Sequence, residues 1–213
     1  MNYEILLATS NKHKLEEFRQ ILCPHGIIVY GISDLNLHPE DDIENGKTYR
    51  DNALIKAESL KSLTSFPIIA DDSGLEIEEL PDILGLHTAR FASEMGGHDK
   101  AIEYILNALK DKKNRNARFV CDLIVLNIED KPLLFEGIAN GSIAYKKGGF
   151  EGFGFDPIFI PEERDECFAL LGQKEKNELS HRGKALKKFI TYLKIKGLIT
   201  KWSILLWKNT STH

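Results

Sequence analysis

Cysteine is scarce in this sequence, and the cysteines that are present form no recognisable pattern. Among the 213 residues there are three, Cys23, Cys121 and Cys167, and no two of them are spaced as C-x-x-C. An odd number without that spacing argues against a disulfide framework and against a structural zinc site. We therefore expect a cytoplasmic protein, because a reducing compartment keeps such thiols free.

Long apolar runs are also missing. No stretch approaches the roughly 20 apolar residues that a membrane-spanning helix needs, and WSILLW at 202–207 is far shorter. The apolar run within the opening MNYEILLATSNKHK is too short for a signal peptide. We expect no membrane partner. Repeats, low-complexity tracts and Pro/Gly/Ser-rich linkers are absent as well, so the sequence shows no clean domain boundary.

A large charge of one sign is lacking too. The net charge is −4, with 28% charged and 42% hydrophobic residues, which is ordinary for a globular protein. Attraction of the whole surface to nucleic acid is therefore excluded. The charge is nevertheless uneven, because PEDDIENG (39–46) and DDSGLEIEEL (71–80) are acidic whereas residues 172–189 carry six cationic and two acidic side chains. This division suits a polyphosphate bound together with a metal ion.

Strand and helix patterns alternate along the chain, which predicts an α/β fold with a mixed sheet rather than a doubly wound parallel one. Asn140-Gly141 is expected near the turn of a hairpin. Ser10 or Asn11, a Thr48/Asp51 capping box and Ser180 are expected to begin helices. The expected elements are strands at 3–9, 66–70, 117–128 and 133–145, helices at 12–22, 46–63, 99–110 and 180–197, a turn at 71–74 and a glycine-rich loop at 146–159.

The stretch TSNKHK, residues 9–14, joins the first strand to the first helix. This geometry directs free backbone N–H groups at an anion. Lys12 and Lys14 oppose the helix dipole at that end, a conflict that a bound phosphate would remove. The G-x-x-x-x-G-K-[ST] pattern of a P-loop is absent. An ordinary solvated helix start explains this stretch equally simply when it is taken alone.

The second helix offers a group of polar residues of different kinds. Asn52 and Lys56 are four residues apart and share one helix edge, and Glu44 precedes the helix. A carboxylate, an amide and an ammonium together suit a metal and a phosphate. A solvated polar face is the alternative.

Two adjacent carboxylates, Asp71 and Asp72, follow the apolar residues 67–70. Residues at the carboxyl ends of strands in α/β folds project toward ligands. Successive strand side chains point in opposite directions, so the two are expected to have different roles. Mg²⁺ prefers a few carboxylates together with waters and substrate phosphates. A plain polar turn at 71–74 is the alternative.

Two later stretches complete the candidate set. GGFEGFGFDPIF, at 148–159, combines glycines with aromatic faces on which a base could stack. In KNELSHRG, His181 and Arg182 open a helix just after Lys176, where three donors suit a keto oxygen or a phosphate. A flexible loop and a cationic surface are the respective alternatives.

Taken together and in this order, TSNKHK, ENGKTYRDNALIKA, ADDSGL, GFGFDPIF and SHRGKALKKF resemble the inosine triphosphate pyrophosphatase family, from about residue 3 to about 195. The resemblance implies a long mixed β-sheet flanked by helices, with two lobes around a central active-site cleft. It implies one such domain over residues 1–197, a homodimer, and a C-terminal extension, 198–213, without an assigned role. The implied activity is Mg²⁺-dependent hydrolysis of ITP, dITP and XTP to the monophosphate and pyrophosphate, by water attack at the α-phosphate.

The resemblance also implies a role for individual residues. Asp72 would be the proton acceptor of the attacking water, and Glu44 and Asp72 would hold the metal. Ser73 would touch the substrate, and Lys176, His181 and Arg182 would recognise the 6-keto edge of the purine. The full expected substrate set is Thr9, Ser10, Asn11, Lys12, His13, Lys14, Asn52, Lys56, Ser73, Phe153, Gly154, Phe155, Asp156, Lys176, His181 and Arg182.

Some residues depart from the family pattern. Phe155 stands where a tyrosine is usual, Leu84-Gly85 replaces a Pro-Gly, Thr88-Ala89-Arg90 replaces S-A-R, and Ile43 replaces a frequent acidic residue. These departures bear on fine specificity rather than on the reaction type. Two other functions remain open: a Maf-like pyrophosphatase for pyrimidine or modified nucleotides, and a nucleotide sensor without catalysis.

Overall fold

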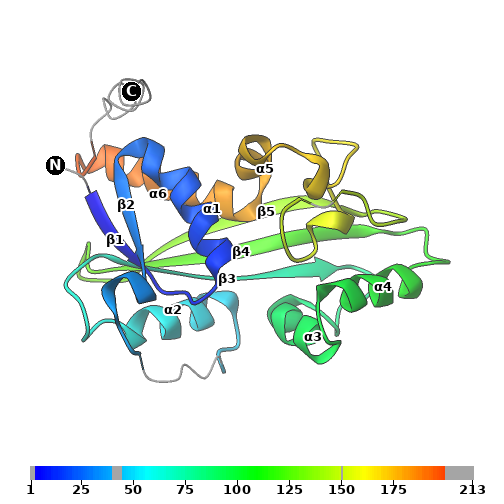
Figure 1. The fold of residues 1–213 in the computed structure, drawn as a ribbon, viewed down its shortest axis with the longest axis horizontal. Helices are drawn as coiled ribbons and strands as arrows, with labels where there is room; N and C mark the ends of the chain where they lie inside the picture. Colours follow the sequence, from blue (N-terminus) through cyan, green and yellow to red (C-terminus); the bar gives the residue numbers. More distant parts are fainter. Residues whose placement is uncertain (1–2, 40–44, 150, 200–213) are drawn as a thin grey trace. The chain divides into compact units, whose positions relative to one another are not determined.

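The chain folds into two compact units that are each built from several separate segments. The computed structural model describes residues 3–39, 45–149 and 151–199 (Figure 1). The first unit comprises the described parts of Met1–Asp72, Asp122–Phe135 and Ala185–His213. The second comprises those of Ser73–Cys121 and Glu136–Lys184. The expected cleft between two lobes stays a prediction.

A mixed β-sheet is the central element, as expected. In the described part of the chain it has six strands in the order β2-β1-β3-β4-β5-β6 (Figure 1). β1 is parallel to β2 and to β3, whereas β5 is antiparallel to β6. The strands are β1 (Tyr3–Leu7), β2 (Ile27–Gly31), β3 (Ile68–Ile77), β4 (Asn116–Leu126), β5 (Leu133–Ile143) and β6 (Phe159–Pro161).

Three helices bury apolar side chains in the first unit. α1 (Lys12–Leu22) buries Phe18 and Leu22, and α2 (Tyr49–Ser59) buries Ala53 and Ala57. α6 (His181–Ile195), whose C-terminal part belongs to this unit, turns Phe189 and neighbouring apolar residues inward. The spacing of three to four residues between these positions explains why helices form where they were predicted, at 12–22, 46–63 and 180–197, although α2 is shorter than predicted at both ends.

The two faces of β3 serve different helices in this unit. Ile68 and Ala70 pack in one cluster with Ala53 and Ala57 of α2. Asp71, which points to the opposite face, meets Lys14 of α1. Strand alternation therefore separates residues 68, 70 and 72 from residues 69 and 71, and it decides which helix each carboxylate can reach.

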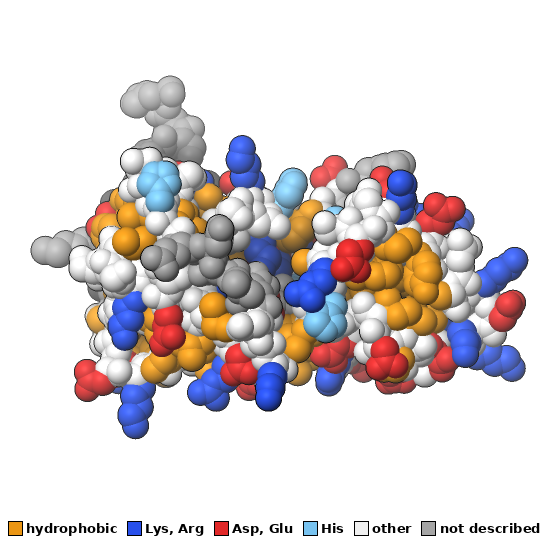
Figure 2. Space-filling view, turned by 90° about the horizontal axis from the view of Figure 1, so that it is seen from below, with side chains coloured by type: hydrophobic (Ala, Val, Ile, Leu, Met, Phe, Trp, Pro, Cys, Tyr) orange, Lys and Arg blue, Asp and Glu red, His pale blue; other side chains and the backbone are white. Residues whose placement is uncertain are grey.

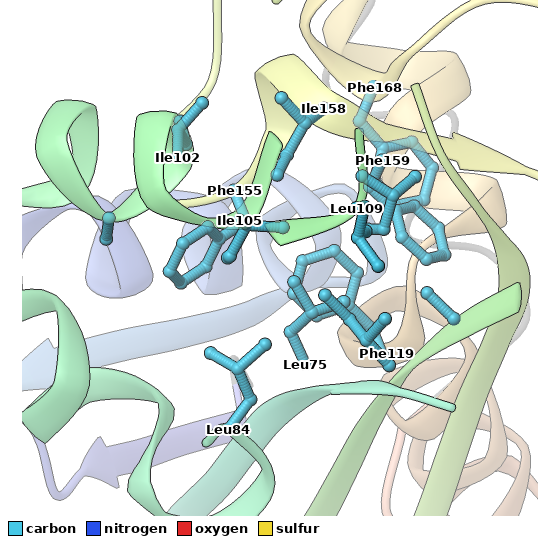
Figure 3. Close-up of a cluster of buried hydrophobic side chains, with 14 of the residues drawn as sticks. Leu75, Leu84, Ile102, Ile105, Leu109, Phe119, Phe155, Ile158, Phe159 and Phe168 are labelled. Atoms are coloured by element: carbon cyan, nitrogen blue, oxygen red, sulfur yellow. The ribbon is translucent and has the colours of Figure 1, made fainter. Parts of the chain in front are cut away.

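The second unit has its own hydrophobic core (Figure 3). Phe119 of β4 lies with its ring centroid 4.7 Å from that of Phe159 of β6, and Phe168 packs on both rings. Ile105 of α4 and Leu109, the residue just after this helix, belong to the same cluster. The α-helices of this unit are α3 (Thr88–Glu94), α4 (His98–Ala108) and α5 (Gln173–Leu179). Short 3₁₀ helices in the described parts of both units are Cys23–His25, Ile32–Leu35, Gly85–His87, Asp156–Ile158 and Phe168–Leu170.

Two expected turns are wrong. Residues 71–74 do not turn, because β3 continues through them to Ile77. Asn140-Gly141 lies inside β5, and the connection from β4 begins instead at Asn127, whose φ of 63° is left-handed. Gly141 is needed for a different reason: a Cβ there would lie 2.1 Å from the carbonyl oxygen of Ile160, so only glycine lets β6 approach.

The surface carries charges of both signs. Figure 2 shows Lys and Arg side chains interspersed with Asp and Glu over the face it presents. In the stretch 172–189, Lys184 pairs with Glu163 and Lys176 pairs with Asp156. Part of the cationic excess expected there is thus neutralised locally. Within the described ranges, no helix combines the length and the apolar character needed to cross a bilayer.

Candidate active site

The turn between β1 and α1 is closed by hydrogen bonds between its own backbone N–H groups and side chains. Asn11 is the N-cap, and its Oδ1 accepts hydrogen bonds from the backbone N–H groups of His13 (2.9 Å) and Lys14 (3.2 Å). The N–H of Asn11 donates to Thr9 Oγ1 at 3.1 Å. Of the two N-cap candidates Asn11 is correct, and residues 10–13 are exposed to solvent.

Asp71 is bound by Lys14. The Lys14 ammonium lies 3.1 Å from Oδ1 and 3.0 Å from Oδ2 of this carboxylate, whose side chain is 1% exposed. A buried carboxylate is costly unless it is paired, so this contact explains how a charge is tolerated in the middle of β3. The sequence predicts that Asp71 and Asp72 differ in role, but it does not predict that Lys14 is the partner of Asp71.

Asp72 is bound from the other side of the sheet by α2. Lys56 Nζ lies 2.8 Å from Oδ1, and Asn52 Nδ2 donates to Oδ2 at 3.2 Å. Asn52 is itself oriented by the N–H of Gly46, which donates to its Oδ1 at 2.9 Å. Burial raises the pKa of Asp72, while Lys56, Asn52 and Lys14 act in the opposite direction. The two carboxylates face different helices, as strand alternation predicts, and the difference in their roles stays a prediction.

The donors around Asp72 fit a hard divalent cation only in part. Magnesium takes one or two protein carboxylates and completes its shell with water and phosphate oxygens. Asp72 supplies one such carboxylate, and Glu44, the second expected ligand, lies outside the described residues. Among the described residues there is no group of three or more His, Cys, Asp or Glu side chains that would form a closed metal site by itself. The set therefore suits magnesium that arrives with a phosphate ligand.

In the second unit, the glycine-rich loop is tied to α5 by one buried carboxylate. Asp156 Oδ2 accepts from the backbone N–H of Phe153 (2.8 Å) and from Lys176 Nζ (2.7 Å). The side chains of this ion pair are 8% and 5% exposed. Gly152 has φ of +79°, and a Cβ there would lie 2.3 Å from Asp156 Oδ2. The carboxylate can reach beneath the loop only because glycine stands at 152.

Lys176 and Arg182 share one aromatic neighbour. The Lys176 ammonium lies 4.6 Å from the ring centroid of Phe153, and the Arg182 guanidinium carbon lies 5.7 Å from it. Both distances are within the range of a cation–π interaction. Arg182 Nη2 also donates to Ser73 Oγ at 2.9 Å. The predicted residues Ser73, Phe153, Lys176 and Arg182 are thus brought together in this unit.

His181 and Phe155 have more internal surroundings than expected. His181 stacks on Phe119, with ring centroids 4.7 Å apart and planes inclined by 10°. Phe155 is 2% exposed and belongs to the hydrophobic core (Figure 3). Its ring makes a T-shaped contact with that of His98. A tyrosine hydroxyl at 155 would need a buried partner, so phenylalanine is compatible with this core. The neighbouring Gly154 has φ of +67°, which favours glycine.

Thr88 is a residue whose structural role was not foreseen. Its hydroxyl accepts from the N–H of Leu75 at 3.0 Å and lies 2.7 Å from the carbonyl oxygen of Gly85. This contact holds the start of α3 against β3, next to Ser73. The only sequence signal was its place in a stretch that resembles the S-A-R of the family, and serine and threonine can both make this contact.

A mixed sheet whose strand β3 carries two buried carboxylates, each paired with a lysine from a different helix, places this chain among α/β proteins with a charged site on a central strand. The sequence model of the Ham1 family matches residues 5–192 of this chain. This chain belongs to the Ham1 family, and the family expected from its motifs is confirmed.

The sequences of individual relatives align with this chain over almost their whole length. The dITP/XTP pyrophosphatase of Shewanella oneidensis is 40% identical over 200 residues, which cover 92% of this chain and 97% of the relative. That of Bacillus subtilis is 40% identical over 187 residues, covering 87% and 94%. The solved Ham1 protein structures of Staphylococcus aureus and Coxiella burnetii superpose with TM-scores of 0.78 and 0.79 at 35% and 34% identity, each covering 91% of this chain and 99% of the other. The expected fold class is thereby confirmed.

Proposed function

We propose that this protein hydrolyses non-standard purine nucleoside triphosphates, namely dITP, XTP and ITP, to the monophosphate and pyrophosphate. The observation that carries the proposal is the buried Asp72 carboxylate, held by Lys56 and Asn52. It lies in a chain 40% identical to proteins named dITP/XTP pyrophosphatases. A water molecule would attack the α-phosphorus, a new P–O bond would form, and the bond to the leaving pyrophosphate would break.

The first unit supplies the groups for the phosphates. The exposed start of α1, with Thr9, Ser10, Asn11, Lys12 and His13, would bind phosphate oxygens, which the positive end of the helix dipole favours. Lys14 and Lys56 would stabilise the negative charge that develops in the transition state. When bound at Glu44 and Asp72, Mg²⁺ would supply charge neutralisation and lower the pKa of a coordinated water. Metal dependence of the reaction is part of this proposal.

Asp72 would accept the proton of the attacking water. A general base is most effective when its pKa lies near the working pH. Burial raises the pKa of Asp72 from the ordinary range of an exposed aspartate, so its carboxylate is a stronger base than an exposed one would be. Asn52 holds Oδ2 in a fixed position, which orients the carboxylate.

The second unit supplies the groups for the base. Lys176 and Arg182 only donate hydrogen bonds, so they suit the 6-keto oxygen of hypoxanthine or xanthine. A 6-amino group would leave these donors without an acceptor, at about 1–3 kcal/mol for each lost partner. Phe153 and the backbone at Gly154 would lie against the base, and Asp156 would hold Lys176. Because Phe155 is buried in the core, its contribution to the base site would come through the backbone.

We further propose that the protein is a homodimer, as its family resemblance implies, and that it is cytoplasmic, as its few unpatterned cysteines indicate. The net charge of −4 argues against a nucleic-acid partner. Light scattering coupled to size-exclusion chromatography tests the dimer directly: a mass twice that of the 24.1 kDa chain supports it, and a monomer mass contradicts it.

Pyrophosphate release over a panel of triphosphates tests the activity. We expect rapid release from dITP, XTP and ITP in the presence of Mg²⁺, little from dATP, and little from any of them after chelation. Turnover of dTTP or UTP well above that of dITP would favour the pyrimidine pyrophosphatase. Nucleotide binding without release would favour the sensor.

The variant Asp72→Asn tests the residue that carries the proposal. It keeps the shape of the side chain but leaves the Lys56 ammonium without its counter-charge, so we expect a folded protein with a lower thermal midpoint, while turnover of dITP falls by a factor of about 100 or more. Lys112→Gln is the matched control, since Lys112 pairs with Glu79 at an exposed position, and it should retain full activity. Near-normal turnover by Asp72→Asn would remove Asp72 from its proposed role.

A further inference from the structure

Lys56 forms an ion pair with Asp72, the carboxylate to which the proposed function assigns a metal ion. Its ammonium lies 2.8 Å from Asp72 Oδ1 and 3.4 Å from the backbone oxygen of Asp71, and Asn52 holds the second carboxylate oxygen. The side chains of Lys56 and Asp72 are 15% and 10% exposed. Water therefore screens this contact only weakly, and the ammonium acts as an internal counter-ion.

We propose that Lys56 is a competing counter-ion that keeps free divalent metal away from Asp72 until a triphosphate arrives and binds the ammonium. The inference deepens the proposed function and rests on its assignment of metal to Asp72. A dication and an ammonium cannot both lie within contact distance of one buried carboxylate oxygen without strong mutual repulsion. The ammonium must therefore move, and the phosphate oxygens of a substrate are the acceptors that can take it.

This exchange makes metal and nucleotide binding mutually favourable. Metal binding releases the Lys56 ammonium from Asp72, and a triphosphate that binds this ammonium releases the carboxylate for the metal. By linkage, each ligand must then strengthen the binding of the other by the same factor. The protein would bind a metal–triphosphate complex well and either component alone poorly.

Lys14 provides a built-in comparison. It lies 3.0 Å from its own carboxylate, Asp71, and its side chain is 17% exposed, much like that of Lys56. Because it faces the other side of β3, its charge is near Asp72 without contacting it. Removing Lys14 changes the local charge by the same amount as removing Lys56, but it leaves the contact on Asp72 in place.

The experiment measures binding of Mn²⁺ alone to the full chain at pH 8, without nucleotide, by electron paramagnetic resonance of the free ion. Lys56→Met keeps the length of the side chain and removes its charge. We expect this variant to bind Mn²⁺ roughly tenfold more tightly than the wild type. Lys56→Arg, which restores the cation, should bind as weakly as the wild type. Lys14→Met should gain roughly threefold or less, because its charge acts only at a distance.

A second measurement follows inorganic triphosphate without metal by calorimetry. Lys56→Met should bind it more weakly than the wild type does, so that one substitution strengthens one ligand and weakens the other. An Mn²⁺ affinity that is unchanged or lower in Lys56→Met overturns the inference. An equal gain in Lys14→Met also overturns it, since the effect would then be one of general charge.

Asp72→Asn separates this inference from the proposed function. If Asp72→Asn abolishes Mn²⁺ binding while Lys56→Met leaves it unchanged, the metal assignment stands and the counter-ion role is wrong. If Asp72→Asn binds Mn²⁺ as the wild type does, the metal does not bind at Asp72, and the metal assignment and the counter-ion role are both overturned. Circular dichroism and the thermal midpoint confirm that each variant is folded.

Discussion

Adjacent like charges are tolerated in β3 because strand geometry gives each one a different neighbour. Asp71 turns toward Lys14 of α1, and Asp72 turns toward Lys56 of α2. Two carboxylates on one face would repel each other, whereas carboxylates on opposite faces can each be neutralised by a separate helix. The two ion pairs stabilise residues 71–74 as part of strand β3, although the residue types there favour a turn.

The ion pair between Asp156 and Lys176 should matter far more for stability than pairs on the surface. We expect Asp156→Asn to lower the free energy of unfolding by about 2–4 kcal/mol, because a buried ammonium loses its counter-charge. Glu163→Gln, which breaks the exposed pair with Lys184, should cost less than about 1 kcal/mol. Urea unfolding measures both. Equal costs for the two variants would show that the buried pair is energetically ordinary.

Individual site residues were predictable from the sequence, but their pairings were not. Asp72 and Lys56 were each assigned to the site from local spacing, yet nothing in the sequence says that they meet across 16 positions. Phe155 was expected to contact the base because it lies in a glycine-rich loop. Its burial depends on α4, which brings His98 against its ring from a distant segment, and local patterns carry no information of that kind.

At the scale of elements, long amphipathic helices were predicted well and short ones were missed. The predicted bounds 12–22 agree with those of α1, Lys12–Leu22. α3 and α5 have seven residues each, about two turns, so their apolar spacing is too brief to be distinguished from a loop. The continuation of β3 through residues 71–74 was missed for another reason, because Asp, Ser and Gly favour turns unless tertiary contacts satisfy them.

The contact between α5 and α6 should not tolerate a side chain at Gly183. A Cβ there would lie 1.7 Å from the backbone oxygen of Asn177, which cannot move aside without shifting α5. We expect Gly183→Ala to lower the free energy of unfolding by about 2 kcal/mol or more and to lower kcat/KM for dITP, because Lys176 and Arg182 sit on these two helices.

Gly172 offers a matched control at the start of α5. A Cβ at this position would meet nothing within 4 Å, and its φ of −61° suits any residue. Gly172→Ala should therefore change the free energy of unfolding by less than about 0.5 kcal/mol. Similar effects of the two substitutions in chemical unfolding and in steady-state kinetics would contradict the packing argument for Gly183.

The start of α4 should make the protein sensitive to mild acid. Burial lowers the pKa of His98, with Asp99 and Asp156 acting in the opposite direction. A histidine whose pKa is lowered in the folded state contributes stability above its unfolded pKa of about 6.5, and this contribution is lost as pH falls through the lowered value. His98→Phe, which keeps an aromatic contact with Phe155, should lose less stability than the wild type between pH 7.5 and 5.5. Urea unfolding at the two pH values measures this, and equal losses would contradict it.

At the scale of the whole molecule, strands and one helix connect the two compact units. β3, β4 and β5 each begin in one unit and continue into the other, and α6 does the same. The residues proposed to bind the phosphates belong to the first unit, and those proposed to bind the base belong to the second. The boundary between them falls inside β3, where Asp72 ends a segment of the first unit and Ser73 begins a segment of the second unit. A single substitution at the end of such a segment can therefore affect both units through one continuous strand.

The C-terminal residues beyond Ile199 should be dispensable for folding and catalysis. The match to the Ham1 family ends at residue 192, and the structure of the S. aureus Ham1 protein is covered over 99% of its length by 91% of this chain. Ile199 is 7% exposed and Leu198 donates to the carbonyl oxygen of Leu193, so the described part of the chain is packed through residue 199. We expect a chain that stops after Ile199 to keep its thermal midpoint within about 3 °C and its kcat/KM for dITP within about twofold, because the packed core is retained. Both tryptophans, Trp202 and Trp207, lie in the removed part, so loss of tryptophan fluorescence verifies the truncation. A lower midpoint, or a changed mass in light scattering, would instead assign this segment to the stability or the assembly of the protein.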